Sequence, residues 1–387
     1  MAMAGYKIRY TPIPALTSER VFPILVNAVR VKNMNDPITT IDPLHDERWD
    51  EFVENHPFGW LCHLSGWKKV LDKSFRHMQG HYIVLMQDGE IQAGLPLFEV
   101  RSWILGNRLV SIPFATLCDP LVSTHEDMDK LFNRALDLSK ELGISSIEIR
   151  TMLTEPYIQD DRLSFSPFFK HHFIPLDRPP EVLNKSFHRT CVRQRITRAS
   201  QSGIEISQGI TTSDVDAFYE LYITTRKRLG LPPEPRAFIQ AIWDTFYPQK
   251  RVSLLLAKKD GLLIGSLMLL KYKSRVSAEF AVWNEEYIKI SPIHGLFWEA
   301  IQAAYREGFA IFDFGRTAPD NHTLMDFKNR WGTQVIDLPF LYYPKNRNAR
   351  AMTSETFFGR KIVRDVCRYA PHPIFKGVGK FLYNHMG

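Results

Sequence analysis

Two motifs near the C-terminal end of the chain carry residue types that suit reactions of anionic substrates. An apolar run at 309–312 predicts a buried strand, and it leads into Asp313–Thr317, with the sequence Asp-Phe-Gly-Arg-Thr. Open sheets bind ligands at the carboxyl ends of strands, where this carboxylate and guanidinium would emerge. The segment Phe327–Gly332 then adds two cations between aromatic residues. The pattern predicts a site for an anionic or oxyanion-forming substrate, with Lys328 and Arg316 as its main cations.

Other kinds of catalytic site have no signature in the sequence. The four cysteines (Cys62, Cys118, Cys191 and Cys367) are scattered without metal-ligand spacing, and His171-His172 lacks partners at such spacing. There is no serine nucleophile elbow, phosphate-binding loop or dinucleotide fingerprint. We therefore expect no metal site and no permanently bound cofactor.

Two copies of one element order must position these motifs. Apolar runs separated by Asp-Gly predict a hairpin within 81–94 and another within 252–265. Each hairpin leads through a further strand to a helix, at 128–142 and 296–306, that is followed by a glycine stop and another strand. The duplication predicts an α/β (α+β) fold with two similar domains in tandem, each a mixed twisted sheet flanked by helices, with a cleft at their interface.

Changes in composition divide the chain into four parts. Residues 1–35 form an irregular N-terminal extension, within which Met34 is an alternative start. The two domains are predicted at 36–180 and 181–345, the second with a basic linker helix. The last part, 346–387, is a basic amphipathic tail.

Positive charge is concentrated in this tail. It holds eight Lys or Arg against two acids, so it accounts for +6 of the net charge of +7. A basic amphipathic segment can lie on an anionic membrane, and its aromatic residues can equally pack on the body of the protein. No apolar run approaches the roughly 20 residues of a spanning helix. We expect a protein of the reducing cytoplasm, with peripheral contact at the inner membrane face as a further expectation.

A second basic segment, 185–202, contains five cations and no acid. It predicts either a solvated helix or a basic wall that faces phosphates.

As a set, the motifs resemble the FemAB-like branch of the GNAT acyltransferase superfamily. That branch includes the Fem peptidyltransferases, which add amino acids to peptidoglycan precursors, and envelope-polysaccharide-associated relatives. The matching segments are Asp313–Thr317, Phe327–Gly332, Thr225–Pro233 and Leu109–Phe114, and the likeness runs from about Asp42 to Pro344. The resemblance implies tandem GNAT-like domains and an N-acyl- or aminoacyltransferase. Its acceptor would be a small-molecule or lipid-linked amine, on a cell-envelope or polysaccharide precursor.

The resemblance also implies roles for single residues. Lys328 would stabilise the charge that develops on the attacked carbonyl, and Arg316 would bind a phosphate or carboxylate unless it pairs with a nearby aspartate. Asp313 is the best placed of the general-base candidates, which are Asp313, Asp326, His294 and Glu279. The residues expected to contact substrate are Phe327, Arg330, Trp331, Arg226, Arg228, Ser111 and Phe114.

The acyl donor would be a co-substrate: acyl-CoA, acyl carrier protein or aminoacyl-tRNA. GNAT enzymes hold the pyrophosphate of coenzyme A at a glycine-rich turn before the central helix, but the matching stretch 290–296 has one glycine. Fem enzymes use aminoacyl-tRNA, yet the long helical arm of some Fem proteins is missing here, which disfavours tRNA. Two alternatives stay open: an acyl-CoA- or acyl-carrier-protein-dependent N-acyltransferase of amino acids or amino sugars, and a non-catalytic GNAT-like binding scaffold.

Overall fold

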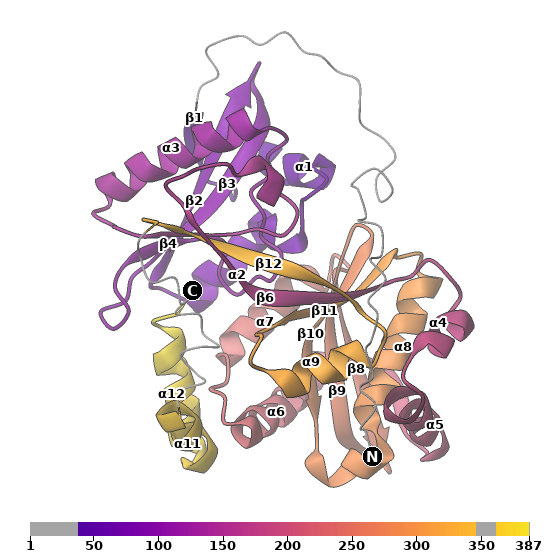
Figure 1. Cartoon of the computed structure of the whole chain (residues 1–387). Helices are drawn as coiled ribbons and strands as arrows, with labels where there is room; N and C mark the ends of the chain where they lie inside the picture. The colour runs from indigo at the N-terminus through magenta and orange to yellow at the C-terminus, as the bar shows by residue number, and fades with distance from the viewer. Residues whose placement is uncertain (1–37, 346–360, 387) are drawn as a thin grey trace, which may run out of the picture. The chain divides into compact units, whose positions relative to one another are not determined.

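A twelve-stranded mixed sheet runs through the part of the chain that the computed structural model describes, residues 38–345 and 361–386 (Figure 1). The strand order is β1-β2-β3-β4-β5-β12-β6-β11-β10-β9-β8-β7. The pairs β4–β5 and β10–β11 are parallel, and the other neighbouring strands are antiparallel. The predicted extension at 1–35 and the first part of the predicted tail, 346–360, lie outside the described residues.

The two halves of this sheet repeat one element order, as the duplicated sequence pattern predicts. The first half consists of β1 (Ile38–Ile41), β2 (Met78–Gln87), β3 (Glu90–Val100), β4 (Arg108–Val110), α3 (His125–Glu141) and β5 (Ile147–Arg150). The second consists of β7 (Glu205–Gly209), β8 (Val252–Lys259), β9 (Leu262–Tyr272), β10 (Arg275–Trp283), α8 (Pro292–Arg306) and β11 (Ile311–Thr317). Both Asp-Gly hairpin turns are present, with positive φ at Asp88, Gly89, Asp260 and Gly261. The α/β class and the tandem arrangement are confirmed.

The last strand of each half lies in the sheet of the other half. Strand β6 (Ser164–Pro175) follows β5 in the chain but pairs with β11, whereas β12 (Gln334–Tyr343) follows β11 but pairs with β5. The two exchanged strands pair with each other and so join the halves (Figure 1). The expectation of two separate sheets is therefore wrong, because hydrogen bonding continues across the junction. The predicted domain boundary between residues 180 and 181 stays a prediction; it separates the two repeats along the sequence.

Further helices cover the sheet and contribute to its cores. They are α1 (Arg48–Asn55), α2 (Ser65–Ser74), α4 (Pro180–Ser186), α5 (Gln194–Gln201), α6 (Thr212–Leu229), α7 (Arg236–Phe246), α9 (His322–Asn329), α11 (Lys361–Tyr369) and α12 (His372–Tyr383). Helices α2 and α7 come from different halves and share one core, where the Trp67 ring lies 6.0 Å from that of Phe238. Among the described residues, no helix is both long and apolar enough to span a membrane.

Gly230 ends α6 in the left-handed conformation, with φ of 71°. A Cβ placed there would lie 2.4 Å from Cγ of Arg364, a residue of α11, so the glycine also allows α11 to pack closely. Gly143, after α3, has a φ of 65° and nothing within 4 Å of such a Cβ. The two glycines therefore share the backbone requirement but differ in packing.

We expect Gly143→Ala to lower the free energy of unfolding by about 1–2 kcal/mol, the cost of a left-handed non-glycine residue. Gly230→Ala should cost at least ~1 kcal/mol more, because the methyl group must also displace α11. Denaturant unfolding of both variants measures the difference. Equal losses in the two variants would show that the α11 contact adds nothing.

Candidate active site

Lys328 joins α9 to the motif on β11. Its side chain is only 5% exposed, and its Nζ donates hydrogen bonds to the carbonyl oxygens of Gly315 (3.0 Å) and Arg316 (2.8 Å). The sequence predicts that the motif Asp313–Thr317 follows the strand, but the motif lies within it. Strand β11 continues to Thr317, with a bulge between Asp313 and Gly315. Lys328 is therefore a buried cation held at the irregular end of β11, which excludes the simpler interpretation as a surface lysine.

Asp313 is enclosed by cationic and hydrogen-bonding groups from three strands. Its Oδ2 lies 3.2 Å from Nε2 of His171 on β6 and accepts a hydrogen bond of 3.0 Å from Arg275 on β10, while its Oδ1 accepts one from the Gly315 N–H. Burial alone would raise the pKa of Asp313, but His171, Arg275 and Gly315 together hold it well below its usual range. Such a carboxylate is a poor proton acceptor, so the expectation that Asp313 is the best-placed base is corrected.

Glu279 has the properties that Asp313 lacks. It lies on β10 at the position where pairing with β9 shifts register, between Ala278 and Phe280, and its side chain is half-buried. The Ser277 hydroxyl donates a 2.7 Å hydrogen bond to its Oε1. A β-bulge can redirect a side chain next to a site, and this one carries a carboxylate.

The pKa of Glu279 is raised to about 7. Burial is the main cause, the hydrogen bond from Ser277 opposes it, and the negative charge of Asp313 adds to it. The cations Arg316 and Lys328 lower it again, so their charges reach this carboxylate. A group with this pKa exists in both protonation states near neutral pH, as a general base requires.

Arg316 lies where the two halves of the sheet meet. Its guanidinium stacks over the ring of Phe169 on β6, 4.9 Å from the ring centre. Its charge also opposes the rise that burial causes in the pKa of Tyr342 on β12 and of Cys118. The candidate site therefore borders side chains from both halves of the chain.

Asp313 and Asp326, the aspartates considered as partners for Arg316, each lie beside another basic side chain. Asp313 accepts a hydrogen bond from Arg275 and lies 3.2 Å from His171, and Asp326 lies 3.6 Å from Arg330, the residue that follows α9.

The aromatic residues around Lys328 form a core rather than a binding surface. Trp331 has no exposed surface, and its ring packs 5.8 Å from His294 and 6.3 Å from the half-buried Phe327. A direct contact of Trp331 with a substrate would require these aromatic residues to move, and it stays a prediction. Burial, and to a lesser extent the nearby Arg195, lower the pKa of His294 to about 4, against the opposing effect of a hydrogen bond with the Cys191 backbone. His294 is thus a neutral core residue and a weak candidate for the base.

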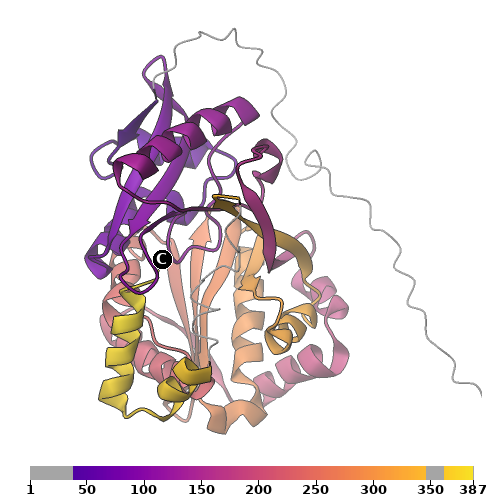
Figure 2. The ribbon, with the colours of Figure 1, turned by 60° about the vertical axis from the view of Figure 1, so that its left-hand side comes forward.

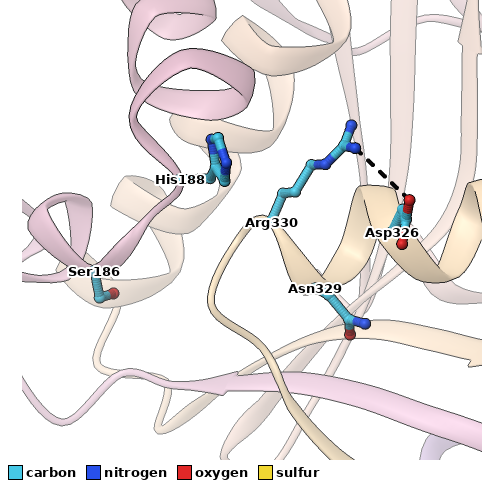
Figure 3. Close-up of a pocket in the computed structure, with 5 residues that line it drawn as sticks. All are labelled: Ser186, His188, Asp326, Asn329 and Arg330. Atoms are coloured by element: carbon cyan, nitrogen blue, oxygen red, sulfur yellow. Dashed lines mark ion pairs between the residues drawn. The ribbon is translucent and has the colours of Figure 1, made fainter. Parts of the chain in front are cut away.

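A surface pocket of about 330 Å³ opens beside α9 and is lined by Ser186, His188, Asp326, Asn329 and Arg330 (Figure 3). Arg330 and Asp326 form an exposed pair, which leaves the role of Arg330 in substrate binding as a prediction. A second hollow, of about 470 Å³, is lined by residues of the predicted basic segment: Arg189, Arg193, Gln194, Thr197, Arg198 and Gln201. The described residues contain no group of three or more His, Cys, Asp or Glu side chains that could hold a metal ion.

Arg226 and Arg228 have structural partners at the end of α6. Arg226 donates to the Pro232 carbonyl and to the Tyr383 hydroxyl (3.1 Å), so it ties α6 to α12. Arg228 pairs with Glu285 at 2.7 Å and stacks over Trp283. Arg226 also lies 3.6 Å from Glu234, so each guanidinium has a carboxylate nearby, and the expected contact of both arginines with the acceptor stays a prediction.

Ser111 and Phe114 belong to the structure of the first half. The Ser111 side chain is buried and accepts a hydrogen bond from the Arg150 backbone N–H, which gives it a structural role, and its contact with substrate stays a prediction. Phe114 has a φ of 58° and packs against Phe75 and Tyr383.

Comparison with known proteins agrees with the fold. Residues 186–329 match the model of an acetyltransferase (GNAT) domain. A UDP-N-acetylmuramoylpentapeptide-lysine N(6)-alanyltransferase from Weissella viridescens is 22% identical over 301 residues, which cover 74% of this chain and 86% of that protein.

Solved structures show the same fold. The crystal structure of FemX superposes with a TM-score of 0.65 at 16% identity, over 80% of this chain and 98% of FemX. L-PGS from Bacillus licheniformis superposes with a TM-score of 0.53 at 15% identity, over 87% of this chain and 98% of L-PGS. A tandem GNAT protein from the clavulanic acid biosynthesis pathway superposes with a TM-score of 0.52 at 12% identity, over 80% of this chain and 99% of that protein. Residues 186–329 therefore carry a GNAT acetyltransferase domain. Over most of its length the chain is similar to Fem-like acyltransferases.

Proposed function

We propose that this chain transfers an acyl or aminoacyl group from an activated ester or thioester to an amine of a cell-envelope precursor. The observation that carries the proposal is Glu279, a carboxylate with a pKa near 7 within the electrostatic reach of two cations. An amine nucleophile needs such a proton acceptor. The acceptor class is proposed from the Weissella viridescens relative, whose name specifies a lysine amine of a UDP-linked muramoyl pentapeptide.

In the proposed reaction the acceptor nitrogen attacks the donor carbonyl while Glu279 accepts the proton that the amine loses. The new C–N bond forms, the C–O or C–S bond of the donor breaks, and the leaving group takes the proton back from Glu279. Arg316 supplies positive charge to the oxyanion or to a phosphate of the substrate. Lys328 acts as a positioning residue, because its ammonium holds the Gly315 and Arg316 carbonyls, and its charge also lowers the pKa of Glu279.

We further propose that the donor is not bound in the manner of coenzyme A. The first turns of α8 are covered by α5 and β7, since a Cβ on Gly295 would lie 3.2 Å from Ala199 and 3.4 Å from Ile206. In the first half, the first turn of α3 contains Glu126 and Asp127, which repel phosphate from its N-terminus. Aminoacyl-tRNA or an acyl carrier protein therefore fits better than free acyl-CoA.

The direct test is a transfer assay with mass-spectrometric detection. The purified chain is incubated with a UDP-linked muramoyl pentapeptide or an amino sugar, and with acetyl-CoA, an acyl carrier protein or aminoacyl-tRNA in parallel. We expect the acceptor to gain one acyl or aminoacyl mass with a donor other than acetyl-CoA. Transfer from acetyl-CoA would contradict the donor proposal. Acceptor binding without transfer from any donor would favour the non-catalytic scaffold.

A further inference from the structure

Exposed apolar side chains are concentrated on the two C-terminal helices and on the β3–β4 loop beside α12. Seven of the seventeen exposed large hydrophobic residues lie on α11, α12 and the β3–β4 loop: Trp103, Ile104, Ile362, Val366, Tyr369, Ile374 and Phe381. They include the three most exposed, Trp103 (81%), Ile362 (79%) and Tyr369 (76%). Single exposed apolar residues are normal, but a concentration of this kind marks an interaction surface.

The packing of the two helices does not require these residues. Helices α11 and α12 lie beside the body of the protein (Figure 2). Helix α11 buries Cys367, and α12 buries Phe375 and Tyr383, so each helix has one inner face. Ile362, Val366 and Tyr369 recur on a different face of α11, at helical spacing of four and three residues, and they face solvent. Ile374 and Phe381 form a comparable exposed stripe on α12. A helix that only packs needs one apolar face, whereas these helices each have two.

The β3–β4 loop adds a tryptophan to the same surface. The Trp103 ring lies 6.4 Å from Phe381 of α12 and 5.4 Å from His385 just after it. Tryptophan and tyrosine are enriched at membrane–water interfaces, where an apolar ring with one polar atom is well accommodated. We call Trp103, Ile362, Val366, Tyr369, Ile374 and Phe381 the apolar ridge.

The charges beside the apolar ridge are almost all positive. Residues 361–386 carry five basic side chains against one carboxylate: Lys361, Arg364, Arg368, Lys376 and Lys380 against Asp365. Lys376 is 3.4 Å from Glu220, and this exposed pair holds it only weakly. Apolar residues that project into solvent beside cations are complementary to a bilayer with anionic headgroups.

We propose that the apolar ridge and its cations dock this protein on the surface of an anionic lipid bilayer. The ridge side chains would enter the headgroup region, and the cations would contact lipid phosphates. The docking is independent of acyl transfer, so it is measured without donor or acceptor, and failure of one proposal leaves the other standing.

The test uses the full chain and sedimentation with vesicles of phosphatidylcholine alone or with about one quarter phosphatidylglycerol. We expect binding to the anionic vesicles only, weakened by raising the salt to about 0.5 M because the charges are then screened. Ile362→Ser with Tyr369→Ser, and separately Lys361→Glu with Arg368→Glu, should each lower the partition coefficient by roughly tenfold or more. All four side chains are exposed, so thermal unfolding should change little.

Matched controls come from other surfaces of the chain. Ile210→Ser removes a 64% exposed isoleucine between β7 and α6, and Lys69→Glu with Lys73→Glu reverses two exposed charges on α2. These variants should bind anionic vesicles as the unchanged protein does. Unaltered binding by the ridge variants, or equal loss in the controls, would overturn the proposal. A dimer in sedimentation velocity that disappears in Ile362→Ser with Tyr369→Ser would assign the ridge to a second copy of the chain instead.

Discussion

Replacing Glu279 by glutamine is expected to lower kcat by about 100-fold or more, because general-base catalysis typically contributes at least that factor. In the unchanged enzyme, the fraction of ionised Glu279 increases with pH, so kcat/KM should rise to about pH 7 and then level off. This rise of kcat/KM with pH, the acidic limb of the profile, should be lost in Glu279→Gln. The measurement is the pH profile of the transfer reaction, once an acceptor is known.

Two controls separate this role from a structural one. Ser277→Ala removes the hydrogen bond that lowers the pKa of Glu279, so the limb should move to higher pH. The folded-state pKa is raised, so the ionised carboxylate destabilises the fold as pH rises from the unfolded value, near 4.5, through about 7. Glu279→Gln should therefore be more stable than the unchanged protein above pH 7, although less active. Near-normal turnover, or a pH profile that neither substitution alters, would refute the assignment.

Replacing Lys328 by alanine should reduce both turnover and stability. The substitution leaves the carbonyl oxygens of Gly315 and Arg316 without this donor in a buried place, at a cost of about 1–3 kcal/mol in the free energy of unfolding. A distorted β11 would misplace Arg316, and we expect kcat to fall by about 100-fold, far more than KM rises. Arginine should rescue little, because a planar guanidinium cannot replace a compact ammonium between two carbonyls.

Arg330→Ala is the matched control, since this exposed cation lies two residues away on the same segment. It should leave stability within about 0.5 kcal/mol of the unchanged protein. Lys328 also lowers the pKa of Glu279, so the pH limb of any residual activity in Lys328→Ala should move upward. An unshifted limb with normal kcat would show that Lys328 is only part of the scaffold.

The elements that local signals define could be predicted from the sequence. Asp88-Gly89 and Asp260-Gly261 fix their turns through positive φ, and Gly143 and Gly308 follow helices in the same way. The exchange of β6 and β12 could not be predicted, because the edge that a strand joins is decided by tertiary packing rather than by its own residues.

The site shows the same division. The sequence pointed to Lys328 and Arg316 through their motifs, and Glu279 was one of four candidate bases. The choice of Glu279 over Asp313 as the base depends on groups distant in the sequence. His171 and Arg275 hold Asp313 ionised, while burial raises the pKa of Glu279 to about 7. The pair His171-His172 had no visible role, since its partner Asp313 is reached only through the pairing of β6 with β11.

The exchanged strands also determine how this chain can be divided. A cut near residue 180 would leave the first fragment with β6 but without β12, and the second with β12 but without β6. Each fragment would expose an unpaired strand edge and would carry a strand, β6 or β12, whose pairing partner lies in the other fragment. Such fragments are suited to recombine with each other rather than to persist alone. The protein thus has the topology of a strand-swapped dimer whose two halves are joined in a single chain. Because they are joined, the two halves are always present in equal amounts.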